Sequence, residues 1–308
     1  MYKRQVRKIS FLISEKKILK TFQHLIKQSD ADDLIIVGSG DDAAVLDTKG
    51  RNIVHSLDIS KINTHFPSNF LPEDIAYRSV AVALSDLAAM GAYPSFMTIG
   101  LTCDSKDLKW YEDFTTGIDN SIKDFKVELV GGDVTFGDIS VCVNVFGFLF
   151  KEPLKRSGAI PGEKIYVTGT LGIGRQGLED FKKNINSEFS KKFKKPEPQF
   201  VKSKYISNLA SSCIDISDGL IKDLSSICSM SNVGASINFE DIPILKDIDD
   251  LTYGDDFELC FTISEENALC LDKSEYFCIG EIIEGEKISL FKDNNLIEIE
   301  KDGWDSFK

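Results

Sequence analysis

Residues 74–94 read DIAYRSVAVALSDLAAMGAYP, and this stretch decides how the chain around it has to fold. Its apolar residues recur at helical spacing, and the opposite side of the same helix is apolar too. The sequence therefore predicts a helix over 73–90 that is buried nearly all round and ends at Gly91. Asp86 is the carboxylate that this helix carries inward. An unpaired buried carboxylate is costly, so Asp86 needs a cation, a metal or hydrogen-bond donors; taken alone, an ordinary salt bridge or cap is the commoner explanation.

Strand-like segments alternate with helix-like segments along the rest of the chain. The runs that predict strands are short, rich in β-branched residues and bounded by Gly or Asp: 53–59, 127–130, 139–150 and 165–168. This alternation favours an α/β or α+β fold over a helical bundle or a β-sandwich. With 308 residues the chain is long enough for two domains. We place their division in the Pro- and Gly-rich segment 151–162, which gives domains 1–150 and 151–308.

The composition, with 42% hydrophobic and 28% charged residues, is that of a folded protein. The 49 acidic residues outnumber the 36 basic ones, which argues against nucleic acid and membrane surfaces as partners. We find neither an apolar run long enough to span a bilayer nor a secretory signal, so we expect a cytoplasmic protein. The seven cysteines show no CxxC pair, and we expect buried reduced thiols.

Carboxylates recur beside glycines and at the ends of predicted strands. There are five such places: Gly40-Asp41-Asp42, Ser56-Leu57-Asp58, Gly131-Gly132-Asp133, Asp215-Ile216-Ser217-Asp218-Gly219 and Gly254-Asp255-Asp256. A single Gly-Asp pair is most often an ordinary turn. Clustered carboxylates, however, cannot all be ionised without cations, and Mg²⁺ prefers carboxylate and phosphate oxygens. Together these places indicate a site for several Mg²⁺ ions, and ATP chemistry follows as a hypothesis.

Two glycine-containing segments bear on how phosphates would bind. Gly172, Gly174 and Gly177 match a dinucleotide fingerprint, but the lysine-rich residues 186–195 show no second strand with a ribose-binding acid, so we do not expect NAD. Neither a P-loop nor a protein-kinase signature occurs in the sequence. Residues 217–219 open an apolar-striped helix, and we expect the amides at its N-terminus to face phosphates.

Six motifs, in order along nearly the whole chain, resemble those of the thiamine-monophosphate kinases. This family belongs to the superfamily of aminoimidazole ribonucleotide synthetase and selenophosphate synthetase. The motifs are GSGDDAAVLD (38–47), DIAYRSVAVALSDLAAMGAYP (74–94), VGGDVTFGD (130–138), RSGAIPGEKIYVTGTLG (156–172), CIDISDGLIKDL (213–224) and YGDDFELCFT (253–262). The resemblance implies a mixed N-terminal sheet with helices, a C-terminal α/β domain, and transfer of the γ-phosphoryl group of ATP to thiamine monophosphate, giving thiamine diphosphate.

The resemblance also implies roles for single residues and an assembly. The implied Mg²⁺ ligands are Asp42, Ser56, Asp58, Asp86, Asp133, Asp215 and Asp218. Gly132, Asp133, Arg156 and Ser217 match positions used for ATP, and His65, Asp255 and Trp304 match positions near thiamine monophosphate. No residue is implied as a covalent nucleophile. The family further implies a homodimer built from N-terminal strands.

The chain departs from the family pattern at a few positions, and two other functions stay open. Leu57, Phe136 and Tyr253 replace a Thr or Ser, an Arg and a Gly, and Asp255 is shorter than the usual Glu. One alternative is another enzyme of the superfamily, although a selenophosphate synthetase would carry a reactive N-terminal Cys or selenocysteine, and no Cys precedes Cys103. The second alternative is a non-catalytic cation or nucleotide sensor.

Overall fold

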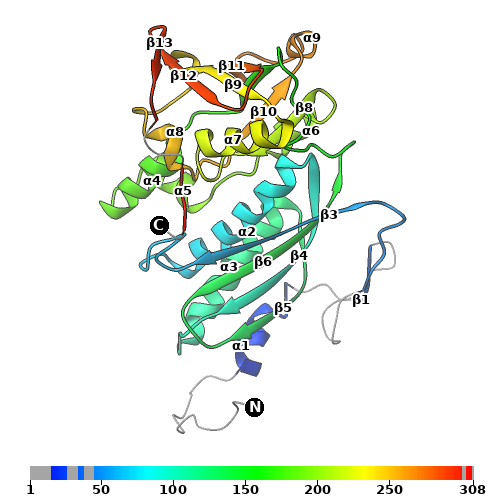
Figure 1. The fold of residues 1–308 in the computed structure, drawn as a ribbon. Coiled ribbons are helices and arrows are strands. Elements are labelled where there is room, and N and C mark those ends of the chain that lie inside the picture. The colour runs from blue at the N-terminus through cyan, green and yellow to red at the C-terminus, as the bar shows by residue number, and fades with distance from the viewer. Residues whose placement is uncertain (1–14, 26–33, 38–44, 300–302, 307–308) are drawn as a thin grey trace, which may run out of the picture.

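The computed structural model describes residues 15–25, 34–37, 45–299 and 303–306 and contains two large sheets (Figure 1). The first half of the chain forms the four-stranded sheet, drawn in the lower part of the figure. The second half forms the seven-stranded sheet above it. The mixed α/β architecture expected from the sequence is confirmed.

The four-stranded sheet has the order β3-β6-β4-β5. Only β4 and β5 run parallel; the other neighbours are antiparallel. Two long helices, α2 and α3, supply the core that packs against this sheet. The bounds are β3 Ile53–Lys61, α2 Pro72–Ala89, β4 Ala92–Thr102, α3 Leu108–Phe125, β5 Glu128–Thr135 and β6 Ser140–Leu149.

The seven-stranded sheet has the order β13-β12-β9-β11-β7-β10-β8. Its neighbours are antiparallel except for the parallel pair β12 and β9. Helix α7, Leu220–Ser231, packs its apolar side into the core of this sheet. The strands are β7 Lys164–Val167, β8 Ala210–Asp215, β9 Gly234–Asn238, β10 Leu259–Ile263, β11 Phe277–Ile283, β12 Ile288–Lys292 and β13 Asn295–Ile297.

Shorter elements complete the described part of the chain. Strands β1 and β2 pair with each other near the N-terminus, and the connection between β7 and β8 is helical. The bounds are α1 Glu15–Phe22, β1 Ile35–Val37, β2 Val45–Leu46, α4 Ile173–Lys182, α5 Glu188–Lys194, α6 Phe200–Ile206, a 3₁₀ turn Phe239–Asp241, α8 Asp250–Tyr253 and α9 Glu265–Ala268.

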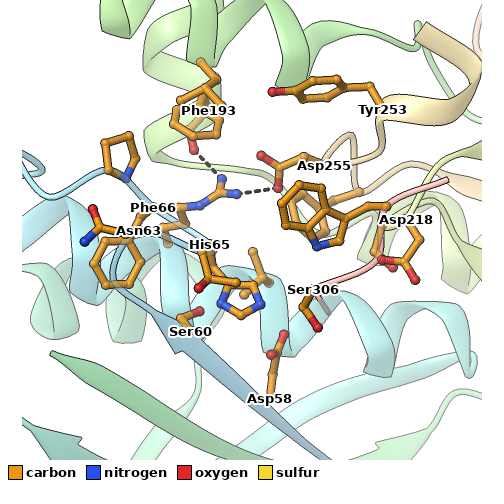
Figure 2. Close-up of a pocket in the computed structure, with 18 of the residues that line it drawn as sticks. Asp58, Ser60, Asn63, His65, Phe66, Phe193, Asp218, Tyr253, Asp255 and Ser306 are labelled. Atoms are coloured by element: carbon orange, nitrogen blue, oxygen red, sulfur yellow. Dashed lines mark hydrogen bonds and ion pairs between the residues drawn. The ribbon is translucent and has the colours of Figure 1, made fainter. Parts of the chain in front are cut away.

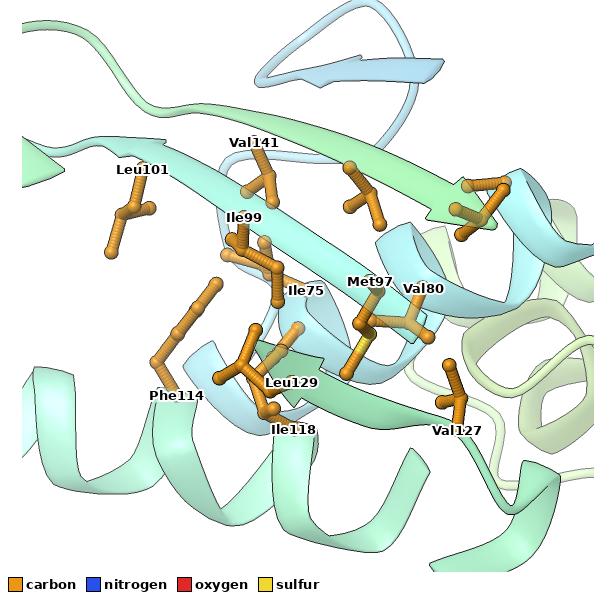
Figure 3. Close-up of a cluster of buried hydrophobic side chains, with 14 of the residues drawn as sticks. Ile75, Val80, Met97, Ile99, Leu101, Phe114, Ile118, Val127, Leu129 and Val141 are labelled. Atoms are coloured by element: carbon orange, nitrogen blue, oxygen red, sulfur yellow. The ribbon is translucent and has the colours of Figure 1, made fainter. Parts of the chain in front are cut away.

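Helix α2 is the central element, as the sequence predicted, and 15 of its 18 residues are buried. Figure 3 shows Ile75 and Val80 of α2 among apolar side chains from β4 and α3. Gly91 follows the helix with φ +72°, a conformation that glycine adopts without strain. The expectation of one inward carboxylate was incomplete: Asp86 is only partly buried, and the fully buried charged residues of the helix are Asp74 and Arg78.

The second half of the chain also packs against α2. Phe193 of α5 belongs to the core of the first half, and Ala89 of α2 belongs to a cluster with β8 and β10. The two large sheets lie on either side of the division at 150/151, which stays our proposal for the domain boundary. The predicted strand at 127–130 is longer in the structure, since β5 continues to Thr135 beside β4.

All seven cysteines are free thiols. Four are buried, as expected, but Cys270 and Cys278 are exposed because they lie in short connections and at a strand end rather than in the core. Within the described residues, we find no helix with the length and apolar character needed to cross a bilayer.

Candidate active site

A cavity of about 760 Å³ opens between the two halves of the chain (Figure 2). Strand β3 and the turn after it contribute Asp58 and His65 to its wall. The second half contributes Asp218, Asp255 and the near-terminal Trp304. With Ser217, the structure thus brings six residues that were predicted to belong to the site, from separate parts of the sequence, into the lining of one cavity.

Ser56 and Asp58 lie on the same side of β3 because they are two residues apart in a strand. The Ser56 hydroxyl donates a hydrogen bond of 2.5 Å to Oδ2 of Asp86 on α2. Burial raises the pKa of Asp58, and the nearby His65 opposes that rise. Burial also raises the pKa of Asp86; the Ser56 hydrogen bond opposes this rise and the charge of Asp58 adds to it. Two partly buried carboxylates therefore face each other across β3 and α2.

Asp215, the last residue of β8, extends this series of carboxylates. Its side chain is buried, and its Oδ2 accepts a hydrogen bond of 2.8 Å from the Ser85 hydroxyl of α2. Burial, followed by the charge of Asp86, raises the pKa of Asp215 to about 7. The charge of the exposed Arg156 opposes this rise in the pKa of both Asp86 and Asp215. Asp58, Asp86 and Asp215, which we call the acidic series, therefore repel one another and lack a cation in direct contact among the described residues.

The remaining predicted metal ligands are less closely gathered. Asp42 lies outside the described residues. Asp133 is exposed on β5, where its Oδ1 accepts the backbone N–H of Val134. Asp218 forms an ion pair of 2.6 Å with Lys222. In the part of the chain that the structure describes, no three His, Cys, Asp or Glu side chains lie close enough together to hold a metal ion.

The predicted ATP positions stand in different surroundings. Gly132 is exposed on β5, where a Cβ atom would lie 2.3 Å from the carbonyl oxygen of Ile99, so the close approach of β4 by itself requires glycine. Arg156 lies on the exposed connection between the two sheets. Ser217 follows β8 and lines the cavity. These three residues come from three separate segments.

The amides at the N-terminus of α7 are not free, contrary to our expectation. One oxygen of Asp223, Oδ2, accepts the backbone N–H groups of Ser217, Asp218 and Gly219 at 3.0, 3.0 and 3.1 Å. Burial raises the pKa of Asp223 to about 7, and the charges of Asp215 and Asp218 contribute to the rise. An acidic residue in the first turn of a helix was the signal in the sequence that could have revealed this internal cap.

The glycines at 172, 174 and 177 serve packing and an internal cap. The carboxylate of Asp256 accepts the backbone N–H groups of Gly172 and Gly174 at 2.9 and 3.0 Å. A Cβ atom at Gly177 would lie 2.4 Å from the carbonyl oxygen of Phe189. The start of α4 is therefore occupied by the chain's own carboxylate.

The residues predicted to lie near the phosphate acceptor line one side of the cavity. Nδ1 of His65 accepts the backbone N–H of Lys61 at 3.0 Å. The backbone N–H of Trp304 donates to the carbonyl oxygen of Asp218 at 2.8 Å, and the Trp304 carbonyl accepts a hydrogen bond of 2.5 Å from Lys222. Sequence reasoning missed Arg78, Phe193 and Phe257, which also line the cavity, because no recognised motif or spacing marks their contact with it.

Two family models match the chain. The AIR synthase related protein N-terminal domain covers residues 40–149, and the C-terminal domain covers residues 161–292. Fold and site therefore place the protein in the class of AIR synthase related proteins.

Relatives within this class are more specific. The chain is 37% identical to thiamine-monophosphate kinase of Buchnera aphidicola subsp. Schizaphis graminum, over 88% of this chain and 93% of that protein. It is 34% identical to thiamine-monophosphate kinase of Escherichia coli K12, over 88% and 92%. The chain belongs to the family of thiamine-monophosphate kinases, as its sequence motifs predicted.

Solved structures agree with this family. The thiamine-monophosphate kinase of Stenotrophomonas maltophilia K279a superposes with a TM-score of 0.77 at 29% identity, covering 92% of this chain and 96% of that one. AaThiL, whose structure is complexed with AMPPCP and TMP, superposes with a TM-score of 0.74 at 26% identity, covering 82% and 86%.

Proposed function

We propose that this protein transfers the γ-phosphoryl group of ATP to thiamine monophosphate, which gives thiamine diphosphate and ADP. The observation that carries the proposal is the acidic series of Asp58, Asp86 and Asp215 at the junction of the two halves, with Asp58 also in the wall of the 760 Å³ cavity. The kinases to which the chain is similar, one of them solved with an ATP analogue and TMP, supply the identity of the two substrates.

The donor chemistry of the acidic series fits Mg²⁺. The three carboxylates are buried or partly buried; the charge of Asp58 raises the pKa of Asp86, and the charge of Asp86 raises that of Asp215. Among the residues that the structure describes, no ammonium or guanidinium group is bonded to them. Bound Mg²⁺ ions would neutralise phosphate charge and bring the acceptor and donor phosphates together. We propose as ligands the acidic series with Ser56 and, from neighbouring segments, Asp42, Asp133 and Asp218.

The cavity has the composition to bind the acceptor. Its wall combines the aromatic side chains of Phe193, Tyr253 and Trp304 with the carboxylates of Asp218 and Asp255. Aromatic faces and carboxylates both attract a flat cationic ring such as a thiazolium. We therefore assign Asp255, Trp304 and His65 to the binding of thiamine monophosphate.

The proposed transfer is direct and in line. The acceptor is itself a phosphate, so its oxygen attacks without a protein nucleophile, and the work of the chain is to position the two phosphates. On the donor side we assign Gly132, Asp133, Arg156 and Ser217 to ATP. The reaction would be the last step in making thiamine diphosphate, and we propose that it takes place in the cytoplasm.

We also propose that the protein is a homodimer. Ile53, Leu57 and Ile59 are exposed on one side of the edge strand β3, where His55 stacks on Phe146 of β6. Apolar side chains in a row on an edge strand are typical of a surface that another chain covers. A second copy of this chain would bury them.

The test is ADP release from ATP and Mg²⁺ with thiamine monophosphate, with thiamine, and without an acceptor. We expect release to depend on thiamine monophosphate, because thiamine offers only a neutral hydroxyl that needs a general base. Asp215→Asn should remove the release, and Asp272→Asn, an exposed site outside the cavity, should keep it. Release that is independent of acceptor, or nucleotide binding without release, would instead support the sensor alternative.

A further inference from the structure

Arg78 is a buried arginine in the middle of α2, with a relative exposure of 4%. Its Nη1 donates a hydrogen bond of 2.5 Å to the carbonyl oxygen of Phe193 in α5, and its Nη2 forms an ion pair with Oδ1 of Asp255 (Figure 2). The guanidinium carbon lies 4.4 Å from the centre of the Phe193 ring and 5.7 Å from that of Phe257. One side chain from the first half thus holds two segments of the second half.

The segment that contains Asp255 has an unusual backbone. Gly254, Asp255 and Phe257 have φ values of +78°, +68° and +55°. A left-handed conformation costs a non-glycine residue about 1–2 kcal/mol, so the surrounding contacts have to enforce it at Asp255 and Phe257. The backbone N–H groups of these two residues donate to Ser217 and Ile216 at 2.8 and 2.9 Å. The segment is thereby tied to the end of β8, and Arg78 supplies its link to α2.

The contact with Arg78 uses only one oxygen of the Asp255 carboxylate. No described residue donates a hydrogen bond to the other oxygen, Oδ2, and the side chain keeps 23% of its surface exposed beside the cavity. Burial raises the pKa of Asp255, and the charge and hydrogen bond of Arg78 oppose that rise. The arginine therefore holds the carboxylate in place by one oxygen and leaves the other for a ligand.

We infer that Arg78 is a positioning residue for the acceptor site: it fixes Asp255 so that Oδ2 receives an N–H group or a cationic ring of the acceptor. The role rests on the proposed function, since the acceptor is the one proposed there. Arg78 acts through Asp255, because both of its terminal nitrogens are already directed to protein oxygens. Substitution of Arg78 should therefore weaken the binding of the acceptor and have little effect on the binding of ATP.

The experiment compares Arg78→Met, Arg78→Lys, Asp255→Asn and the double variant Arg78→Met with Asp255→Asn. Losing one partner of a buried charge pair commonly weakens binding by about tenfold or more. We expect Arg78→Met to raise KM for thiamine monophosphate by about that factor and to change KM for ATP and kcat by less than about threefold. Arg78→Lys should recover part of the loss, because an ammonium keeps the charge but not the two-pronged geometry.

Lys194→Met is the matched control. Lys194 forms an ion pair of 2.9 Å with the buried Asp74 and so also joins α5 to α2, but neither residue lines the cavity. We expect this variant to lose thermal stability and to keep KM for thiamine monophosphate. The double variant should be no worse than Asp255→Asn alone, because Arg78 acts only through the Asp255 carboxylate.

Three results would overturn the role of Arg78. These are an unchanged KM for thiamine monophosphate in Arg78→Met, an equal rise in Lys194→Met, and fully additive effects in the double variant. If Arg78→Met does not fold, Arg78→Lys and Asp255→Asn decide the same question. A wild-type protein that binds thiamine monophosphate in calorimetry without phosphorylating it refutes the proposed function alone, and the Kd of the variants then tests Arg78. A wild-type protein that does not bind it overturns both.

Discussion

The substitution Asp215→Asn tests whether burial and the charge of Asp86 make an ionised Asp215 costly in the ligand-free protein. The Asp215 carboxyl has a pKa of about 7 in the folded protein against an ordinary value of 3.8. An acid with a raised pKa binds its proton more tightly in the folded state, so the free energy of unfolding falls as the pH rises from about 4 to about 7. At up to 1.36 kcal/mol per pH unit, with the slope halved by pH 7 where the carboxyl is half ionised, the fall between pH 5 and pH 7 is about 2 kcal/mol.

Asparagine keeps the shape of the side chain and can accept the hydrogen bond of Ser85, but it has no charge. Its amide N–H groups cost about 1–3 kcal/mol where they find no acceptor, and this cost does not change with pH. We therefore expect the free energy of unfolding of Asp215→Asn, relative to wild type, to rise by about 2 kcal/mol between pH 5 and pH 7. Over the same range, the turnover of the variant should be lower than that of wild type by about a hundredfold or more.

The assay is urea unfolding of ligand-free protein in a metal chelator, followed by tryptophan fluorescence at several pH values. Asp272→Asn is the control, because hydrogen bonds from Ser274 lower the pKa of Asp272 and its carboxylate is ionised in both states above pH 5. The free energy of unfolding of Asp272→Asn, plotted against pH, should run parallel to that of wild type. A parallel curve for Asp215→Asn as well would refute the idea that ionising Asp215, buried and beside Asp86, destabilises the ligand-free protein.

Three further predictions concern the cations, Asp86 and the dimer. Mg²⁺ together with a non-hydrolysable ATP analogue should raise the melting temperature, measured by scanning fluorimetry, more than either ligand alone. The reason is that the acidic series is neutralised only when phosphate oxygens complete the coordination shells of the metal ions. An equal rise with Mg²⁺ alone would contradict this prediction. Asp86→Ala should abolish ADP release and leave the melting temperature of the ligand-free protein equal or higher, whereas a large fall would favour a purely structural role through Ser56. Leu57→Glu on the exposed side of β3 should convert a dimer into a monomer in light scattering, and a wild-type monomer would exclude the proposed interface.

The sequence predicted those parts of the fold that depend on local pattern. Helix α2, its end at Gly91 and strands β3, β6 and β7 follow from periodicity and from the residues at their ends. The burial of Arg78 and Asp74 did not follow, because their partners Asp255 and Lys194 lie more than a hundred residues further along the chain. Charged residues on an apolar helix show that partners exist, but only the packing of the two halves shows which ones.

The sequence singled out carboxylates that the structure brings near one another, but not the groups that contact them. Carboxylates at the ends of predicted strands led to Asp58 and Asp215, which the structure brings into one series with Asp86. The expectation for the amides before α7 was wrong because Asp223 is near enough to cap them itself. A motif shows that backbone donors are present, whereas their occupancy depends on side-chain geometry that the sequence does not specify.

The most direct test of the proposed activity is the fate of the γ-phosphoryl group of ATP. ATP carrying ¹⁸O in its γ-phosphate would be incubated with the wild-type protein, Mg²⁺ and thiamine monophosphate, and the thiamine compounds would be analysed by mass spectrometry. Direct transfer predicts thiamine diphosphate whose terminal phosphate carries the label, formed in step with ADP. Labelled inorganic phosphate beside unchanged thiamine monophosphate would contradict the proposed function.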